Sequence, residues 1–309
     1  MCPKVYYVRM SMENRSLRKL FETGRTEDPL DEIQVLLAII APSFPRKPLE
    51  DLHQVIGLIF NGKHPQYKQS NTKYHDLGHT YSVVLATIRI FHGLYCEGWS
   101  VSEETVNKAL YSAYFHDCGL LLKRSEDEKS GAAFTIGHEK RSMFFMADYL
   151  KDKGFSYPFI TDCSVIIQAT NLGINPDSLF FHSAEMQLAA FAVGTADILA
   201  QMADRCYLER LPFLFLEFQE AGIDFHNSPQ ELMQQTSKFY HDIVIDRLAH
   251  SFGNVTKYMK VHFRERWSMA ENLYLVNMKK NIKYMQYIIA QNDADMYSLR
   301  QYLRRNPPE

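Results

Sequence analysis

The sequence has few cysteines, and their positions exclude two classes of covalently braced protein. Five occur in 309 residues, and no two of them form a Cys-x-x-Cys pair. A disulfide scaffold or a zinc ribbon needs closely spaced pairs. The chain must therefore fold around an ordinary apolar core, which its 46% hydrophobic residues can supply. The cysteines are Cys2, Cys96, Cys118, Cys163 and Cys206.

Long apolar segments are also missing. The longest apolar run covers residues 35–41, whereas about 20 residues are needed to cross a bilayer. The first residues contain no apolar stretch of the kind that marks a secretory signal. We therefore expect a cytoplasmic protein that does not enter a membrane.

Neither sign of charge dominates. The chain has 34 lysines and arginines against 36 acidic residues, a formal net charge of -2. No overall basic field is present to recruit nucleic acid or an anionic membrane. This balance does not exclude a small anionic partner, which a local metal site can hold, and homo-oligomer formation is left open.

Strand patterns are missing as well, and apolar residues recur at helical spacing instead. Val83, Ala86 and Ile90 are one example, since they fall on one face of a helix. This spacing predicts an all-α fold. The helices that carry the polar residues of interest are expected at 79–94, 103–121, 138–150 and, as one long helix, 183–211, with a helical pattern continuing over 229–302.

Several histidines and aspartates fall at inward positions of these helices. His79 shares the stripe of Val83, and Asp197 lies on a stripe of small and apolar residues. An unpaired buried carboxylate is costly, so such a group needs a partner. One cation held by imidazole and carboxylate ligands would satisfy four of these side chains together, whereas the simpler reading is a hydrogen-bonded network without an ion. The four are His79, His116, Asp117 and Asp197.

This pattern resembles the HD-domain metal-dependent phosphohydrolases, in which a histidine, a His-Asp doublet and a distant aspartate lie on helices. The resemblance covers roughly residues 70–212 and implies an HD-type helical bundle with the metal ligands just named. We therefore expect an arm over 1–28, a phosphohydrolase core over 29–219 and a C-terminal helical extension over 220–309 that packs on the core. The ligand types suit one divalent ion, Mn, Fe, Co, Ni, Zn or Mg.

Two short segments of the sequence resemble motifs of particular subgroups of that family. The phrase Tyr74-His75-Asp76-Leu77-Gly78-His79 is similar to one in cyclic-nucleotide phosphodiesterases, which implies that His75 is a general acid, although Asp76 stands where asparagine is usual. His138 falls where HD-GYP phosphodiesterases carry another metal-binding histidine, and a surface histidine at a helix start is the other reading. The two adjacent histidines and the Gly-Tyr-Pro phrase of that subgroup are missing, so a complete second metal site is not expected.

The implied reaction is hydrolysis of a phosphomonoester or phosphodiester, with a nucleotide as one candidate substrate. A metal ion would activate water, Asp117 or Glu139 would accept its proton, and His75 would protonate the leaving group. Glu139 is also placed by the resemblance, near the bound water. Candidate phosphate contacts are Lys73, Lys123, Arg141 and Arg205.

Other functions stay open. One is a non-catalytic HD module that binds a nucleotide or a protein partner in signalling, and another is a di-iron oxygenase of the same fold, which would need a complete two-metal ligand set. The aromatic cluster of Phe213, Phe215 and Phe218 is expected in the core, with a nucleobase-stacking wall as the second reading.

Overall fold

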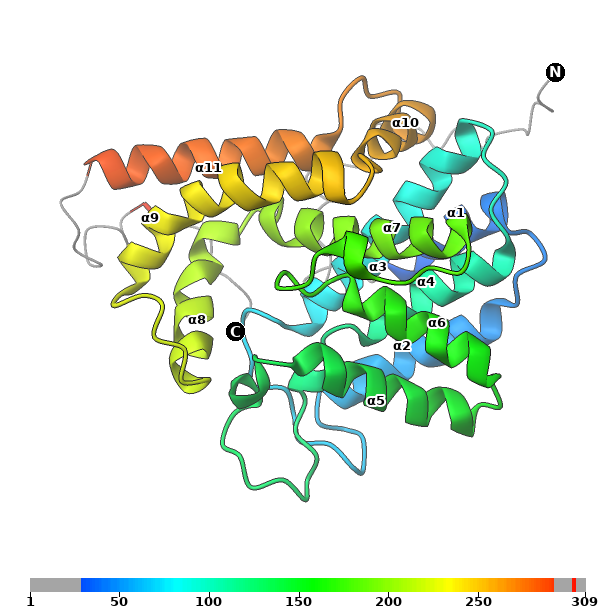
Figure 1. Cartoon of the computed structure of the whole chain (residues 1–309), viewed down its shortest axis with the longest axis horizontal. Coiled ribbons are helices and arrows are strands. Elements are labelled where there is room, and N and C mark those ends of the chain that lie inside the picture. Colours follow the sequence, from blue (N-terminus) through cyan, green and yellow to red (C-terminus); the bar gives the residue numbers. More distant parts are fainter. Residues whose placement is uncertain (1–28, 292–301, 304–309) are drawn as a thin grey trace.

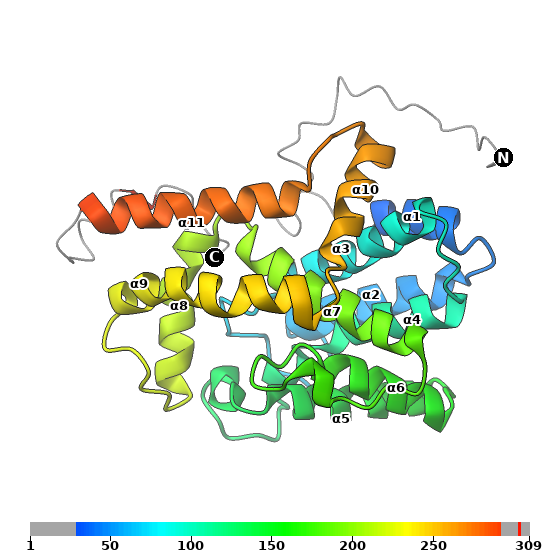
Figure 2. The same ribbon diagram turned by 45° about the horizontal axis from the view of Figure 1, so that its top comes forward.

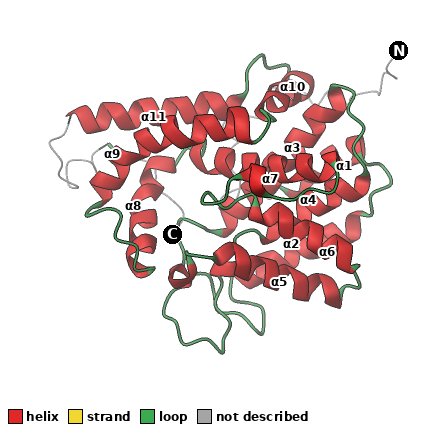
Figure 3. Cartoon of the chain, viewed as in Figure 1, coloured by secondary structure: helices red, strands yellow, loops and turns green. Residues whose placement is uncertain are grey.

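A computed structural model describes residues 29–291 and 302–303, so the expected arm over residues 1–28 lies outside the described part. Within these residues the fold contains eleven α-helices and no strand, which confirms the all-α prediction (Figure 3). The helices are α1 (Leu30–Ile40), α2 (Arg46–Phe60), α3 (Leu77–Cys96), α4 (Glu103–Phe115), α5 (His138–Asp152), α6 (Tyr157–Gln168), α7 (Ala184–Met202), α8 (Tyr207–Glu220), α9 (Pro229–Phe239), α10 (Thr256–Trp267) and α11 (Leu273–Gln291).

Helix α3 lies at the centre of the molecule and contacts α1, α4, α7 and α10 (Figure 1). Fifteen of its twenty residues are buried, which is typical of a helix that is apolar on all sides. Asp76 begins it as N-cap, because its side chain accepts a hydrogen bond from the backbone N–H of His79 at 2.8 Å. The first site histidine, His79, is thereby fixed in the first turn of this largely buried helix. His75 precedes the helix.

Helix α4 ends earlier than the sequence predicts. It stops at Phe115, and His116-Asp117 is followed by a short 3-10 turn, Cys118–Leu120 (η3). The expected helix over residues 103–121 is therefore wrong in its last turn. Gly119 explains the change, because this part of the chain approaches the start of α5 more closely than a helix with side chains would permit.

The predicted single helix over residues 183–211 is also wrong. It breaks between Met202 and Tyr207, and α8 leaves at 107° to α7. The turn is stabilised by the Asp204 side chain, which accepts the backbone N–H of Cys206 at 2.8 Å. It is further tied to α11, because the amide of Asn281 donates to the carbonyl oxygens of Met202 and Asp204. The corner turns α8 back towards the start of α3.

The C-terminal helices share the core of the rest of the molecule. Two π-helical turns, η6 (Tyr240–Val244) and η7 (Arg247–Ser251), continue α9. Helix α10 packs along α3, and α11 lies beside α9 in both views (Figures 1 and 2). One hydrophobic cluster runs from Ile33 to Ile288, so the described C-terminal helices share it with the rest of the molecule, and the division into core and extension at residue 219 stays a prediction.

None of the described helices is by itself both long and apolar enough to cross a membrane; α7 and α8 reach that length and composition only when taken together as a bent pair.

Candidate metal centre

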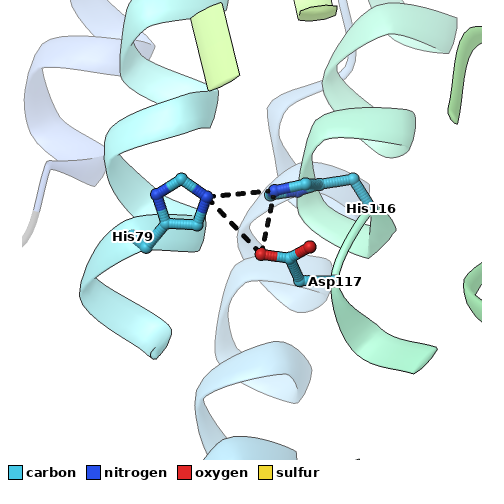
Figure 4. A group of neighbouring side chains, drawn as sticks. All are labelled: His79, His116 and Asp117. Atoms are coloured by element: carbon cyan, nitrogen blue, oxygen red, sulfur yellow. Dashed lines mark hydrogen bonds and ion pairs between the residues drawn. The ribbon is translucent and has the colours of Figure 1, made fainter. Parts of the chain in front are cut away.

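Three buried side chains point towards one another where α3 meets the end of α4 (Figure 4). The Nε2 atoms of His79 and His116 are 3.3 Å apart. Asp117 Oδ2 lies 3.1 Å from His116 Nε2 and 3.5 Å from His79 Nε2. These three residues could hold a metal ion.

Asp197 of α7 adds a second carboxylate to this group. Its Oδ1 is 3.0 Å from His79 Nε2 and 3.7 Å from His116 Nε2. Its side chain is 19% exposed, against 4% for Asp117, so Asp197 faces the open side of the cluster. The structure thus brings together all four residues proposed from the sequence as ligands.

The orientation of His116 shows that the cluster needs a positive charge at its centre. Its Nδ1 lies 2.8 Å from the carbonyl oxygen of Ala113, and a carbonyl can only accept, so Nδ1 carries a proton. The Nε2 of the neutral ring then presents a lone pair to His79 and to Asp117. Asp117 Oδ2 is buried and has no hydrogen-bond donor. Only a proton or a cation between these atoms relieves the repulsion.

The spacing fits a small divalent cation. Ligand atoms about 2.1 Å from an ion are separated by about 3.0 to 3.4 Å in octahedral or tetrahedral arrangements, and the contacts here range from 3.0 to 3.7 Å. The His116–Ala113 hydrogen bond is the kind of support that metal-binding histidines have, because it fixes the tautomer and the ring orientation. The donor set therefore fits a transition metal of nitrogen and oxygen preference.

Protons compete for the same atoms. Burial opposes the charging of His116, but the adjacent Asp117 carboxylate outweighs it and raises the pKa of His116 to about 9. Burial also disfavours the charged form of Asp117, yet the positive charge of protonated His116, together with His138, holds the pKa of Asp117 well below its usual range. Metal binding must therefore displace protons from the histidines.

His138 lies on the opposite side of Asp117. Its Nε2 is 3.3 Å from Asp117 Oδ1, and its Nδ1 is 2.8 Å from the carbonyl oxygen of Thr135. The two oxygens of Asp117 thus face different histidines. Glu139, which is buried, follows directly, with one carboxylate oxygen 3.7 Å from His138 Nδ1.

The first turn of α5 reaches this position because the chain opposite has no side chain at one residue. A Cβ at Gly119 would lie 2.0 Å from the backbone oxygen of His138. Ser142 joins the two segments, since its hydroxyl donates to the carbonyl oxygen of His116 and accepts the N–H of Gly119. The His-Asp segment and α5 therefore form one packed unit.

His75 is held beside the cluster by a residue that the sequence reasoning missed. Glu217 of α8 binds His75 Nδ1 at 2.7 Å and accepts the backbone N–H of Tyr74 at 2.8 Å. Burial opposes the protonation of His75, but the charge and hydrogen bond of Glu217 outweigh it and raise the pKa of His75 to about 9. The sequence does offer one signal for Glu217: it lies inside the aromatic run 213–218, and a carboxylate that is buried with such a run needs a partner.

A second missed residue is Arg210. Its guanidinium binds Asp76 Oδ2 and Asp204 Oδ2, both at 3.1 Å. Asp76, which stands where the related phrase has asparagine, therefore caps α3 with one oxygen and binds α8 with the other. Nothing in the spacing of the sequence indicates this pairing.

A cavity of about 700 Å³ opens beside the cluster. The cavity is lined by His75, Asp117, His138, Glu139 and Asp197. The candidate catalytic residues (His75, Asp117 and Glu139) and the candidate ligand Asp197 therefore reach the same solvent-accessible space. A volume of this size is typical of small-molecule sites, which span about 300 to 1,000 Å³.

The four cations expected to contact phosphate do not line this cavity. Lys73 lies over the ring of Phe213, and Arg141 is bound to Glu126 and to two backbone carbonyls. Lys123 is exposed, and Arg205 lies in the turn between α7 and α8. A role in substrate binding stays a prediction for all four.

Comparison with known proteins adds one partial match. A model of the Npun_R2479-like family matches residues 126–277, whereas no curated protein matches the chain. The matched segment contains His138, Asp197 and helices α8 and α9, while the His79–His116–Asp117 group lies before it. The resemblance to HD-domain phosphohydrolases therefore rests on the motif residues alone. Over residues 126–277 the chain is similar to the Npun_R2479-like family.

Proposed function

We propose that this protein is a metal-dependent phosphohydrolase that cleaves a phosphate ester with water. The observation that carries the proposal is the convergence of four nitrogen and oxygen ligands on one point at the edge of a cavity. Two of the ligands are histidines from different helices, and the more exposed ligand, Asp197, faces the cavity side. A buried polar network with no function would not need an open side.

A divalent ion at this point would lower the pKa of a bound water and polarise a phosphoryl oxygen. The protein groups around it supply the proton transfers. Asp117 and Glu139 both line the cavity and carry carboxylate oxygens that can accept the proton of an attacking water. Asp117 is held ionised by its histidine neighbours, and this suits it to orient the water even where Glu139 is the base.

His75 is the proposed acid. Its Nδ1 is engaged by Glu217, which leaves Nε2 to carry the proton that is given away. In the reaction, a bond forms between the water oxygen and phosphorus, and the bond from phosphorus to the ester oxygen breaks. That oxygen leaves as an alcohol with the proton from His75, and the proton of the water passes to the base.

The test is metal content per chain on the purified full-length protein, combined with hydrolysis of p-nitrophenyl phosphate and bis-p-nitrophenyl phosphate after loading with Mn, Fe, Co, Ni, Zn or Mg. We expect about one ion per chain in the wild type. His116→Ala should lose both the ion and hydrolysis, because it removes a ligand from the centre of the cluster. His241→Ala, at an exposed histidine outside the site, is the matched control and should keep both.

The result that overturns the proposal is a protein that hydrolyses neither ester with any metal, or a His116→Ala variant that retains wild-type metal content. One ion per chain without hydrolysis of either ester would instead favour a non-catalytic binding module.

The placement of His138 makes the number of ions a separate question. Because Asp117 Oδ1 faces His138 and Oδ2 faces His79 and His116, His138 and Asp117 are the residues that would help to hold a second ion. One ion per chain in both the wild type and His138→Ala supports the single-ion site. Two irons per chain without ester hydrolysis would favour the oxygenase.

A further inference from the structure

The cavity has two chemically different ends, and the far end is formed by α8. Tyr207, Leu211, Leu214 and Phe218 line it, at intervals of four, three and four residues. This spacing places them on one face of the helix, and that face is turned towards the cavity. The helix thus presents an apolar stripe to an open space.

The opposite wall repeats this arrangement. Leu232, Thr236, Phe239 and Ile243 of α9 and η6 also line the cavity, again at helical intervals. Tyr207, Leu211 and Leu232 are buried in the core at the base of these stripes, whereas Leu214, Phe218 and Phe239 are half-buried and Ile243 is exposed. The apolar atoms that remain open to the cavity form a site that an apolar group can fill, and burying them from water is favourable.

Positive charge is scarce on these walls. Among the described residues that line the cavity, Lys238 is the only lysine or arginine, and it is exposed at the rim. Four acidic groups line the same space: Asp117, Glu139, Asp197 and Asp242. One phosphate can be neutralised at the candidate metal centre, but a second or third phosphate would lie near carboxylates, with Lys238 as the only lysine or arginine among the described lining residues.

We propose that the substrate is the monophosphate ester of an uncharged, largely apolar alcohol, whose hydrocarbon part lies between α8 and α9. The assignment rests on the proposed phosphohydrolase function for the reacting end. It goes beyond that function in stating what is attached to the phosphate, and it disfavours nucleoside di- and triphosphates.

The first experiment uses the metal-loaded, full-length protein and a series of n-alkyl phosphates from ethyl to octyl, with released inorganic phosphate as the readout. Burial of each methylene between the two stripes should raise kcat/KM by roughly two- to fourfold until the cavity is filled. Hexyl phosphate should also be cleaved with a higher kcat/KM than AMP, ADP or ATP. A flat dependence on chain length, or a preference for any of the three nucleotides, overturns the assignment.

The second experiment compares two leucines of α8. Leu214 lines the cavity, whereas Leu216 is 49% exposed and does not. Leu214→Gln should lower the hexyl-to-ethyl ratio of kcat/KM by roughly three- to tenfold, because it replaces apolar contact with a polar amide. Leu216→Gln should leave the ratio unchanged. Equal effects of the two substitutions would contradict the placement of the chain.

The third measurement separates this inference from the proposed function. Affinities of n-alkylphosphonates, which are not hydrolysed, are measured by calorimetry on the metal-loaded protein. If affinity rises with chain length while no ester is hydrolysed, the phosphohydrolase proposal fails and the apolar binding site stands. If esters are hydrolysed but affinity does not change with chain length, the apolar assignment fails and the phosphohydrolase stands.

Discussion

At the scale of single residues, the carboxylate of Glu217 binds two groups beside the candidate metal centre. It accepts the backbone N–H of Tyr74 and binds the ring of His75, a residue 142 positions away in the sequence. Glu217 is only 4% exposed, so water screens its charge weakly. It therefore favours the protonated imidazole, which is the form that a general acid needs.

Glu217→Gln should move the alkaline limb of the pH–kcat/KM profile to lower pH. The substitution removes the charge that raises the pKa of His75 to about 9 and leaves burial, which lowers it. A cation at the centre lowers the starting value, but the direction of the change is the same. The profile is measured on metal-loaded protein with p-nitrophenyl phosphate and bis-p-nitrophenyl phosphate.

Metal content should be unchanged in Glu217→Gln, because Glu217 is not among the ligands. Glu220→Gln, an exposed acid one turn further along α8, should reproduce the wild-type profile. An alkaline limb that stays in place in Glu217→Gln would remove His75 from the role of acid.

At the scale of elements, the approach of η3 to α5 fixes the geometry between the His-Asp doublet and His138. Gly119 has no side chain to hold the two segments apart, and Ser142 joins them with two hydrogen bonds. Segments packed this closely cannot accommodate an added methyl group unless one of them moves.

Gly119→Ala should therefore reduce metal content and hydrolysis together. The added Cβ would lie 2.0 Å from the backbone oxygen of His138, so the start of α5 must shift and carry His138 and Glu139 with it. Gly98→Ala provides the control: its added carbon meets nothing within 4 Å, and only the positive φ of 83° is strained. We expect Gly98→Ala to lose about 1 kcal/mol of stability and to bind metal normally.

The contact between α3 and α10 contains a pair of buried histidines outside the site. His92 Nδ1 and His262 Nδ1 lie 3.3 Å apart. Burial and the nearby charge of Arg266 lower the pKa of His92 to about 4, and burial holds the pKa of His262 well below its usual range. Both rings are therefore neutral in the folded protein at pH 7.

Because both histidines resist protonation in the folded protein, we expect the protein to lose stability in mild acid. Below pH 6.5 the unfolded chain takes up a proton at His92 that the folded protein does not, so the free energy of unfolding falls as the pH is lowered towards 4 and levels off below it. His92 alone accounts for up to about 3 kcal/mol over this range, and His262 acts in the same direction. The measurement is urea unfolding at pH 4 to 8.

His92→Leu should reduce the slope of unfolding free energy against pH, between pH 4.5 and 6, by about 1.4 kcal/mol per pH unit. His241→Gln, which changes an exposed histidine, should not. An unchanged slope in His92→Leu would mean that the acid sensitivity comes from other groups.

At the scale of the whole molecule, α11 holds the corner from which α8 leaves. Asn281, 6% exposed, donates to the carbonyl oxygens of Met202 and Asp204. Met202 is the last residue of α7, where carbonyl oxygens lack partners within the helix, and Asp204 lies in the turn that follows. One side chain from the C-terminal region thereby sets the direction of the helix that supplies Arg210, Glu217 and one wall of the cavity.

Asn281→Ala should destabilise the protein by about 1 to 3 kcal/mol, because it removes the hydrogen bonds from the Asn281 amide to the carbonyl oxygens of Met202 and Asp204. It should also increase amide hydrogen exchange in α8 more than elsewhere. Asn272→Ala is the matched control, since Asn272 is likewise buried and donates to a backbone carbonyl, that of Thr256. Its exchange increase should be confined to the α10–α11 connection. Equal protection of α8 in the two variants would contradict this role of α11.

The sequence by itself determined what depends on local physics. Helical periodicity gave the all-α class, and the inward positions of His79 and Asp197 placed polar groups in the core, where a partner is required. The residue types also indicated a group of side chains that could hold a metal ion, and His79, His116 and Asp117 do lie together in the structure. These conclusions use side chains within a few turns of each other and do not depend on how the helices pack.

Tertiary structure alone decided the rest. The end of α4 at Phe115 depends on the approach of α5, and the corner after Met202 depends on Asn281. The partnership of His75 with Glu217 joins residues 142 positions apart, and no local pattern specifies it. The division of the cavity into a charged and an apolar end follows from the same packing, because a helix face becomes a wall only once another element leaves space opposite it.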